Sequence, residues 1–143
     1  MRTLLVFVFA AVALSTNAQT FNLSPGASIQ ETIVQAQDGD EIILSAGTYS
    51  GDIDFLGKAI SITGAGESTV LEGTGTNPVV SFTSGELNSS ILSSLTVTGS
   101  KVNEAISIEN SSPLVSNCEI TRNSSNTVAS GIAINGQAQG QVA

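Results

Sequence analysis

The side chains with the clearest chemical potential are five carboxylates in the first half of the chain. Asp38, Asp40 and Glu41 are nearly contiguous. Asp52 and Asp54 follow two positions apart. Hard oxygen ligands of this kind suit Ca²⁺, so the four aspartates are weak candidates for a calcium site. Their spacing matches no recognised calcium loop, and the alternative is solvated charge that discourages pairing with another chain.

Carboxylate and cationic side chains could also take part in catalysis. Glycoside hydrolysis needs two carboxyl groups about 5–9.5 Å apart, and Asp52 and Asp54 would share one strand face near the lower limit. Such pairs are frequent on any acidic surface. The cations after residue 18 are Lys58, Lys101 and Arg122. We expect Lys58 to be a solvated turn residue, and we expect Lys101 in a turn and Arg122 at a strand end to have structural or solubilising roles. We therefore assign no catalytic residue and no cofactor-binding residue.

The composition excludes several other kinds of chemistry. The chain has no histidine, which excludes Ser-His-Asp and Cys-His nucleophile systems and histidine-ligated metal sites. Cys118 is the single cysteine, so an intrachain disulfide and a cysteine metal cluster are also excluded. The net charge of −8 disfavours nucleic acid and anionic membrane surfaces, because both attract cationic proteins.

Residues 1–18 have the pattern of an export signal. Arg2 provides a positive charge, residues 4–14 form an apolar run of eleven, and Ser15-Thr16-Asn17-Ala18 offers small residues for cleavage before Gln19. The run is too short for a membrane-spanning helix, which needs about 20 residues. We therefore expect a secreted or cell-surface protein, with the periplasm as an alternative and no membrane contact after cleavage. Loss of Arg2 would bring the net charge near −9.

One helix is expected after the signal, over residues 28–38. Ser28-Ile29-Gln30-Glu31 has the form of a capping box, and apolar residues at i, i+4 and i+7 give the helix one apolar face. Gly39 is expected to end it. A helix this short needs a packing partner, and the open end of a stack of strands would provide one. Residues 19–40 are therefore expected to cap a repetitive unit formed by residues 41–143.

From residue 41 onward, the helical period gives way to short alternating segments separated by Gly, Asn, Ser and Asp. These segments are shorter than the strands of a typical sandwich. Val80-Ser81-Phe82 recurs at a spacing of 26 as Ile106-Ser107-Ile108, and again at 26 as Ile132-Ala133-Ile134. The expected strands are residues 42–44, 53–55, 60–62, 70–71, 79–82, 95–97, 106–108, 118–120 and 132–134.

A second series interleaves with the first. Leu95-Thr96-Val97-Thr98 recurs at a spacing of 23 as Cys118-Glu119-Ile120-Thr121. Ile60-Ser61-Ile62-Thr63 matches it at 35 if residues 84–90 form a longer turn. Periods in the low to middle twenties correspond to one coil of a solenoid, whose equivalent strands pair in parallel about 4.8 Å apart. The sequence therefore predicts an all-β fold, a right-handed parallel β-helix of about three to four coils with a short N-terminal capping α-helix.

The two series divide the side chains between a core and an outer face. Val80, Ile106 and Ile132 are expected to stack inside, with Phe82, Ile108 and Ile134 beside them. Cys118 is expected to be a small apolar member of the second core column, since no neighbouring cation lowers its pKa. A hydroxyl-rich outer face suits polysaccharide, although aromatic platforms are nearly absent. The expected outward residues are Ser61, Thr63, Thr96, Thr98, Glu119 and Thr121.

Several segments carry a likeness to known proteins. They are Ile29-Gln30-Glu31, residues 36–40, Ala46-Gly47-Thr48-Tyr49, residues 55–60, Gly64-Ala65-Gly66 and residues 110–120. Together they resemble the right-handed parallel β-helix proteins of the pectin-lyase-like superfamily, especially secreted bacterial proteins with parallel β-helix repeats. The likeness covers nearly all of residues 26–136. It implies the fold but no single activity, because this opening precedes lyases, hydrolases, epimerases and surface proteins alike.

The sequence ends soon after residues 132–134 and shows no capping pattern there, so we expect the solenoid to continue beyond residue 143. We expect a noncatalytic module that contacts polysaccharide or a cell-surface glycan, or acts as a scaffold, and that binds no nucleic acid. One alternative is the N-terminal part of a polysaccharide lyase or glycoside hydrolase. A less favoured alternative is an ice-binding surface built on the Thr-x-Thr pattern. Ca²⁺ is the one cofactor that the sequence suggests, and the sequence predicts no oligomeric state.

Overall fold

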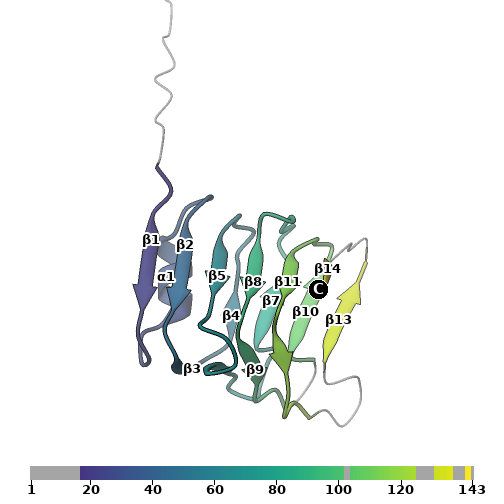
Figure 1. Ribbon diagram of the computed structural model, residues 1–143. Coiled ribbons are helices and arrows are strands. Elements are labelled where there is room, and N and C mark those ends of the chain that lie inside the picture. The colour runs from purple at the N-terminus through teal and green to yellow at the C-terminus, as the bar shows by residue number, and fades with distance from the viewer. Residues whose placement is uncertain (1–16, 102–103, 125–130, 137–140, 143) are drawn as a thin grey trace, which may run out of the picture.

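Parallel strands wound into a solenoid make up most of the molecule (Figure 1). The computed structural model describes residues 17–101, 104–124, 131–136 and 141–142. Within these residues, four turns contribute one strand to each of three sheets, one of these sheets carries two further strands, and the chain makes about five turns. The expected all-β parallel solenoid with one short helix is confirmed, with about five turns where three to four were expected.

We name the three sheets A, B and C. Sheet A contains β1 (Thr20–Leu23), β2 (Glu41–Leu44), β5 (Ser61–Thr63), β8 (Ile91–Ser93), β11 (Leu114–Ser116) and β14 (Gln141–Val142). Sheet B contains β3 (Gly47–Ser50), β6 (Thr69–Glu72), β9 (Thr96–Thr98) and β12 (Glu119–Ile120). Sheet C contains β4 (Ile53–Asp54), β7 (Val80–Phe82), β10 (Ile106–Glu109) and β13 (Ile132–Asn135).

The strand register confirms the two regular repeats that the sequence predicts. In sheet C, Ile106 pairs with Val80 on one side and with Ile132 on the other. In sheet B, Glu119 pairs with Thr96. Equivalent residues of successive turns therefore lie directly above one another, as a period of 23 to 26 residues requires.

The alignment of residues 60–63 with residues 95–98 is wrong. β5 lies in sheet A, where Ser61 pairs with Ile91, whereas Thr96 lies in sheet B. The two segments share the same alternation of apolar and polar residues because any half-buried strand has it. That alternation identifies a strand, but it does not identify the sheet to which the strand belongs.

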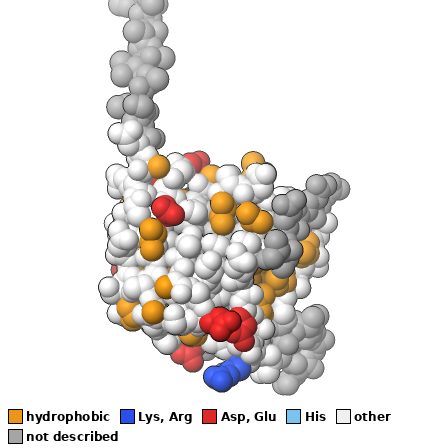
Figure 2. All heavy atoms as spheres, viewed as in Figure 1, with side chains coloured by type: hydrophobic (Ala, Val, Ile, Leu, Met, Phe, Trp, Pro, Cys, Tyr) orange, Lys and Arg blue, Asp and Glu red, His pale blue; other side chains and the backbone are white. Residues whose placement is uncertain are grey.

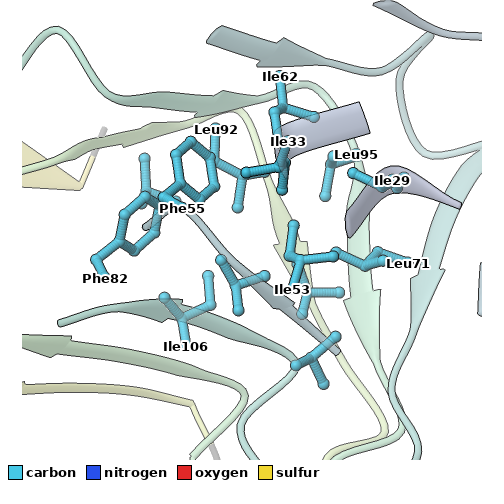
Figure 3. Close-up of a cluster of buried hydrophobic side chains, with 14 of the residues drawn as sticks. Ile29, Ile33, Ile53, Phe55, Ile62, Leu71, Phe82, Leu92, Leu95 and Ile106 are labelled. Atoms are coloured by element: carbon cyan, nitrogen blue, oxygen red, sulfur yellow. The ribbon is translucent and has the colours of Figure 1, made fainter. Parts of the chain in front are cut away.

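A continuous apolar core fills the solenoid (Figure 3). Ile62 and Leu92 enter it from sheet A, and Leu71 enters it from sheet B. Phe55 and Phe82 pack together with ring centroids 4.3 Å apart. Each such side chain stabilises the fold by about 1.5–3 kcal/mol when it is fully buried, so this column is the main source of stability.

The core is less well covered at β13, the outermost strand of sheet C in the described residues. Ile132 is half-buried, and Ile134 is 47 % exposed. Ile134 nevertheless pairs in register with Ile108, as the repeat of 26 predicts. Ile108 lies one turn further in and is fully buried, because strands flank it on both sides.

Helix α1 (Ile29–Gln35) packs its apolar face on the first turns of the solenoid. Ser28 is its N-cap, and the Ser28 side chain accepts a hydrogen bond from the amide N–H of Glu31, as one half of a capping box requires. Ile29 and Ile33 are buried. Within the described residues, no helix is long and apolar enough to cross a membrane.

The helix ends at Gln35, earlier than residue 38, and a lysine from another turn of the solenoid caps its last turn. Ala36 is already extended. The Lys58 Nζ atom donates to the carbonyl oxygens of Ile33, Val34 and Ala36 at 2.6, 2.8 and 2.7 Å. A cation at a helix C-terminus satisfies the last carbonyls and interacts favourably with the helix dipole. Lys58 is therefore half-buried and not the solvated turn residue that the sequence suggests.

Glu86 is a buried carboxyl group in the long turn between β7 and β8, where it is 1 % exposed. One of its oxygens accepts from the Gly57 amide at 2.8 Å. The other accepts from the Ser84 amide at 2.9 Å and from the Ser111 hydroxyl at 2.8 Å. Because Gly57 and Ser111 belong to the turns of the solenoid before and after Glu86, this side chain connects three consecutive coils.

Candidate functional site

The outward side chains of sheet B form two parallel rows across the solenoid. The register places Thr48, Val70, Thr96 and Glu119 in the first row. The second row contains Ser50, Glu72 and Thr98. Thr121 follows Ile120 of β12, and the Thr121 amide donates to the carbonyl of Val97, which continues the second row by one further strand.

Part of this face is hollowed into an open groove of about 290 Å³. Residues from β6, β9 and β12 form its floor, and residues of two adjoining turns form its sides. The lining combines hydroxyl groups, two carboxylates, one guanidinium group and one apolar side chain. The groove, which we name the sheet B groove, is lined by Glu67, Val70, Thr96, Thr98, Glu119, Thr121 and Arg122.

Backbone contacts hold the first side of the groove in place. The Thr96 hydroxyl, on a side chain only 7 % exposed, donates to the carbonyl of Glu67 at 3.2 Å. The amides of Gly64 and Gly66 donate to the carbonyls of Ser93 and Ser94. The turn before β6 is therefore bonded to the next coil, and Glu67 extends from it into solvent.

An asparagine holds the opposite side. The Asn123 side-chain amide donates to the carbonyls of Val97 and Thr121, both at 3.0 Å, while its oxygen accepts from the Ser100 amide at 2.9 Å. These bonds tie the turn after β12 to the coil below it. Arg122 adopts a left-handed backbone conformation there, with a φ of 53°, and its side chain is exposed beside Thr121.

Charged groups of both signs line the groove. Glu67, Glu119 and Arg122 are all exposed, so water screens the interactions among them. Acidic and basic side chains also lie side by side at the lower edge of the molecule in the view of Figure 2. The groove as a whole can donate hydrogen bonds from hydroxyl and guanidinium groups and accept them at carboxylates.

The four aspartates proposed as weak metal ligands are each bonded to protein donors. Asp38 accepts from the Ala59 amide, and Asp40 accepts from the amides of Gln19 and Gln37. The structure therefore uses these two side chains to fasten the N-terminal cap. Among the described residues, no group of three or more His, Cys, Asp or Glu side chains is arranged to hold a metal ion.

Asp52 and Asp54 do not act as a pair on one strand face. Asp52 lies in the turn before β4 and accepts from the amide and hydroxyl of Thr74 and from the side-chain amide of Asn77. Asp54 lies on β4, where it accepts from the Leu56 amide. Each carboxylate organises its own turn, a common role for aspartate.

The expected outer face is divided between two sheets. Thr96, Thr98, Glu119 and Thr121 share the sheet B groove, as the repeat of 23 predicts. Thr63 belongs to sheet A, where its hydroxyl lies 3.2 Å from that of Ser93. The placement of Ser61 and Thr63 in the same row as Thr96 is therefore wrong, for the same reason that the alignment at 35 is wrong.

Cys118 and the aromatic residues do not contribute to the groove. Cys118 is half-buried against the core, and burial raises the pKa of its thiol, in agreement with the expected core position. Tyr49 is 1 % exposed and donates to the carbonyl of Leu23 at 2.8 Å. Phe55 and Phe82 are fully buried, so none of these three rings can act as a stacking platform for a sugar.

Three residues that line the groove were not predicted from the sequence: Glu67, Val70 and Arg122. Glu67 comes from a turn, and its position depends on the length of that turn rather than on strand alternation. Val70 is outward although it is apolar, so the pattern gives no signal for its direction. Arg122 directly follows Thr121, which was expected to face outward, and this neighbouring position could have indicated that Arg122 lies at the groove.

No protein-family model matches this chain, and no curated protein or solved structure matches it significantly. The parallel β-solenoid is therefore established by the strand pairing alone. The likeness to the pectin-lyase-like superfamily stays a prediction from the sequence.

Proposed function

We propose that this chain is an exported β-solenoid module that binds a polysaccharide in the sheet B groove without cleaving it. The observation that carries the proposal is the set of polar groups in one open groove on a rigid face. Three threonine side chains, two carboxylates and a guanidinium group line about 290 Å³. Sugars present many hydroxyl groups, and paired donors and acceptors at fixed spacing are what such a ligand requires.

Charge narrows the class of ligand. The chain has a net charge of −8, and two of the three charged groups in the groove are Glu67 and Glu119. A polyuronate would meet repulsion from both carboxylates. A neutral or amine-bearing glycan avoids that repulsion, so we expect it to bind more tightly than pectate or alginate.

The expected binding affinity is low because no aromatic side chain in the groove lining is available for a sugar ring to stack on. Sugar-binding sites gain affinity from aromatic faces, and the groove lining contains no aromatic residue. Hydrogen bonds that replace bonds to water contribute only about 0.5–1.5 kcal/mol each. We therefore expect weak binding to each short segment of ligand, with useful affinity arising from repeated contacts along a polymer.

The test is affinity electrophoresis or titration of the chain with neutral, amine-bearing and uronate polysaccharides. Thr98→Val keeps the side-chain volume and removes one hydroxyl from the groove, so binding should weaken about threefold to tenfold. Thr48→Val is the matched control, because Thr48 lies on the same sheet outside the groove lining. Equal affinity of both variants and the wild type would refute the assignment of the groove.

The presence of two carboxylates in one groove favours a second candidate, a glycoside hydrolase or polysaccharide lyase. Glu67 or Glu119 would then act as an acid, base or nucleophile, and Arg122 would bind substrate. Release of reducing ends or unsaturated uronides, measured with and without Ca²⁺, separates the two functions. Turnover abolished by Glu119→Gln and retained by Glu109→Gln, an exposed residue of sheet C, would replace the binding proposal with the enzymatic one.

A further inference from the structure

The backbone of Gln19 is held at the first edge of the solenoid by two hydrogen bonds. The Gln19 amide donates to Asp40 Oδ1 at 2.7 Å, and the carbonyl of Gln19 accepts from the Glu41 amide at 2.8 Å. β1 begins at the next residue. Asn17 and Ala18 are exposed. Among the described residues, Gln19 is therefore the first that is hydrogen-bonded to the rest of the fold.

The Asp40 side chain that accepts the hydrogen bond from Gln19 is itself held in place by other contacts. The side chain is 5 % exposed, and its second oxygen accepts from the Gln37 amide at 2.7 Å. The backbone of Asp40 also bonds to Gln37 and Ser61. The amide donors of Gln37 and Gln19 hold the pKa of Asp40 below its usual range, which favours the charged form of the carboxyl group.

The neighbouring charged groups leave Oδ1 without a cation in direct contact. Lys58 acts on Asp40 at longer range, while its Nζ atom is bonded to three helix carbonyls. Asp38 bonds to the Ala59 amide, and Glu41 is half-buried on β2. Among the described residues that precede β1, the donor that meets Asp40 Oδ1 is the neutral amide of Gln19.

We propose that Asp40 is a binding site for the α-ammonium group that export processing creates on Gln19. This inference rests on the proposed export of the chain. Water adds across the Ala18–Gln19 peptide bond under the action of a signal peptidase, which leaves a carboxylate on Ala18 and an ammonium group on Gln19. The new cation occupies the position of the former amide nitrogen, beside the buried carboxylate of Asp40. Removal of the signal thereby converts a neutral hydrogen bond into a charge-assisted ion pair.

The ion pair also protects the new terminus from a known side reaction. An N-terminal glutamine cyclises when its free amine attacks its own side-chain amide carbon. That step forms a five-membered lactam and releases ammonia. Only the unprotonated amine is a nucleophile, and a nearby carboxylate stabilises the protonated form. Capture by Asp40 therefore slows cyclisation of Gln19.

The experiment uses the full chain, expressed with residues 1–18 in an exporting host. Mass spectrometry of the recovered protein identifies its first residue. The pKa of the α-amine is then measured by NMR after labelling with ¹³C-formaldehyde, in the native protein and in urea. We expect Gln19 at the N-terminus and a native α-amine pKa about half to one pH unit above the unfolded value. The shift is modest because Gln19 is exposed.

The variant Asp40→Asn gives a second readout. Its native α-amine should lose the raised pKa, and cyclisation, followed by the loss of ammonia in the mass spectrum, should run about threefold to tenfold faster at neutral pH. Asp38→Asn is the matched control and should behave as the wild type. One outcome would refute the binding of the ammonium group by Asp40 but not the export of the chain. In that outcome the chain begins at Gln19, its α-amine has the same pKa in the native and unfolded protein, and Asp40→Asn cyclises at an unchanged rate. A chain that keeps residues 1–18 overturns both.

Discussion

Glu86 offers the sharpest test of how the coils are held together, because one buried side chain connects three of them. The substitution Glu86→Gln keeps the shape of the side chain and replaces one acceptor oxygen by an NH₂ group. In the wild type, both oxygens meet only donors: the amides of Gly57 and Ser84 and the hydroxyl of Ser111. The glutamine can satisfy some of these groups but not all of them.

The magnitude follows from the three bonds. A glutamine oxygen can retain the Gly57 amide, and the Ser111 hydroxyl can turn to accept from the new NH₂ group. The Ser84 amide then faces another donor. An unsatisfied buried donor costs about 1–3 kcal/mol, and a bond to a charged acceptor contributes about 1.5–3 kcal/mol. Ser84 is an exposed residue, so water recovers part of this loss, and we expect the free energy of unfolding to fall by about 2 kcal/mol.

The assay is urea denaturation followed by circular dichroism, with the free energy of unfolding obtained by linear extrapolation. Glu109→Gln is the control, because Glu109 is exposed on sheet C and its substitution should change stability by less than about 0.5 kcal/mol. Glu86→Ala should cost more than Glu86→Gln, since it removes all three bonds. If Glu86→Gln and Glu109→Gln unfold at the same urea concentration, the three-coil connection contributes nothing measurable and the reasoning fails.

Three further predictions concern the cap and the thiol. Lys58→Met should lower the free energy of unfolding by about 1–2 kcal/mol in thermal or urea melts, because it frees three carbonyls at the end of α1, whereas the exposed Lys101→Met should have little effect. The folded-state pKa of Asp40 is lowered. The contribution of Asp40 to stability is therefore full above the unfolded pKa of about 3.9 and is lost as the pH falls through the folded pKa. Thermal or urea melts between about pH 5 and pH 2 should show a smaller loss of stability with falling pH in Asp40→Asn than in the wild type. Because burial raises the pKa of Cys118, native protein should react with iodoacetamide at pH 8 at least about tenfold more slowly than protein in urea, and equal rates would contradict the burial of the thiol.

Strand alternation and exact repetition predicted most of the fold. The pairing of Ile106 with Val80 and Ile132 follows from identical spacing and needs no knowledge of the turns. Five strands were not predicted, namely residues 20–23, 47–50, 91–93, 114–116 and 141–142. The strand of residues 91–93, for example, was missed because Ile91 and Leu92 lie beside polar serines and resemble the end of a turn. Its sheet could not be identified either, since the preceding turn is longer than its equivalents.

The helix end and the groove show where local sequence information stops. Ser28 was recognisable as an N-cap because its partner Glu31 is three residues away. The C-terminal cap is provided by Lys58, more than 20 residues later, and no local pattern predicts such a contact. Thr96 and Thr98 were assigned outward correctly, whereas Glu67 reaches the groove from a turn whose course only the folded chain defines.

The central claim is that a polysaccharide binds in the sheet B groove. The most direct measurement is a titration of the isotopically labelled protein with a neutral or amine-bearing oligosaccharide, followed by amide NMR shifts. The account predicts that shifts concentrate on Thr96, Thr98 and Thr121 and on the adjoining turns with Glu67 and Arg122. Shifts that fall on sheet A or sheet C, with sheet B unchanged at saturation, would contradict it.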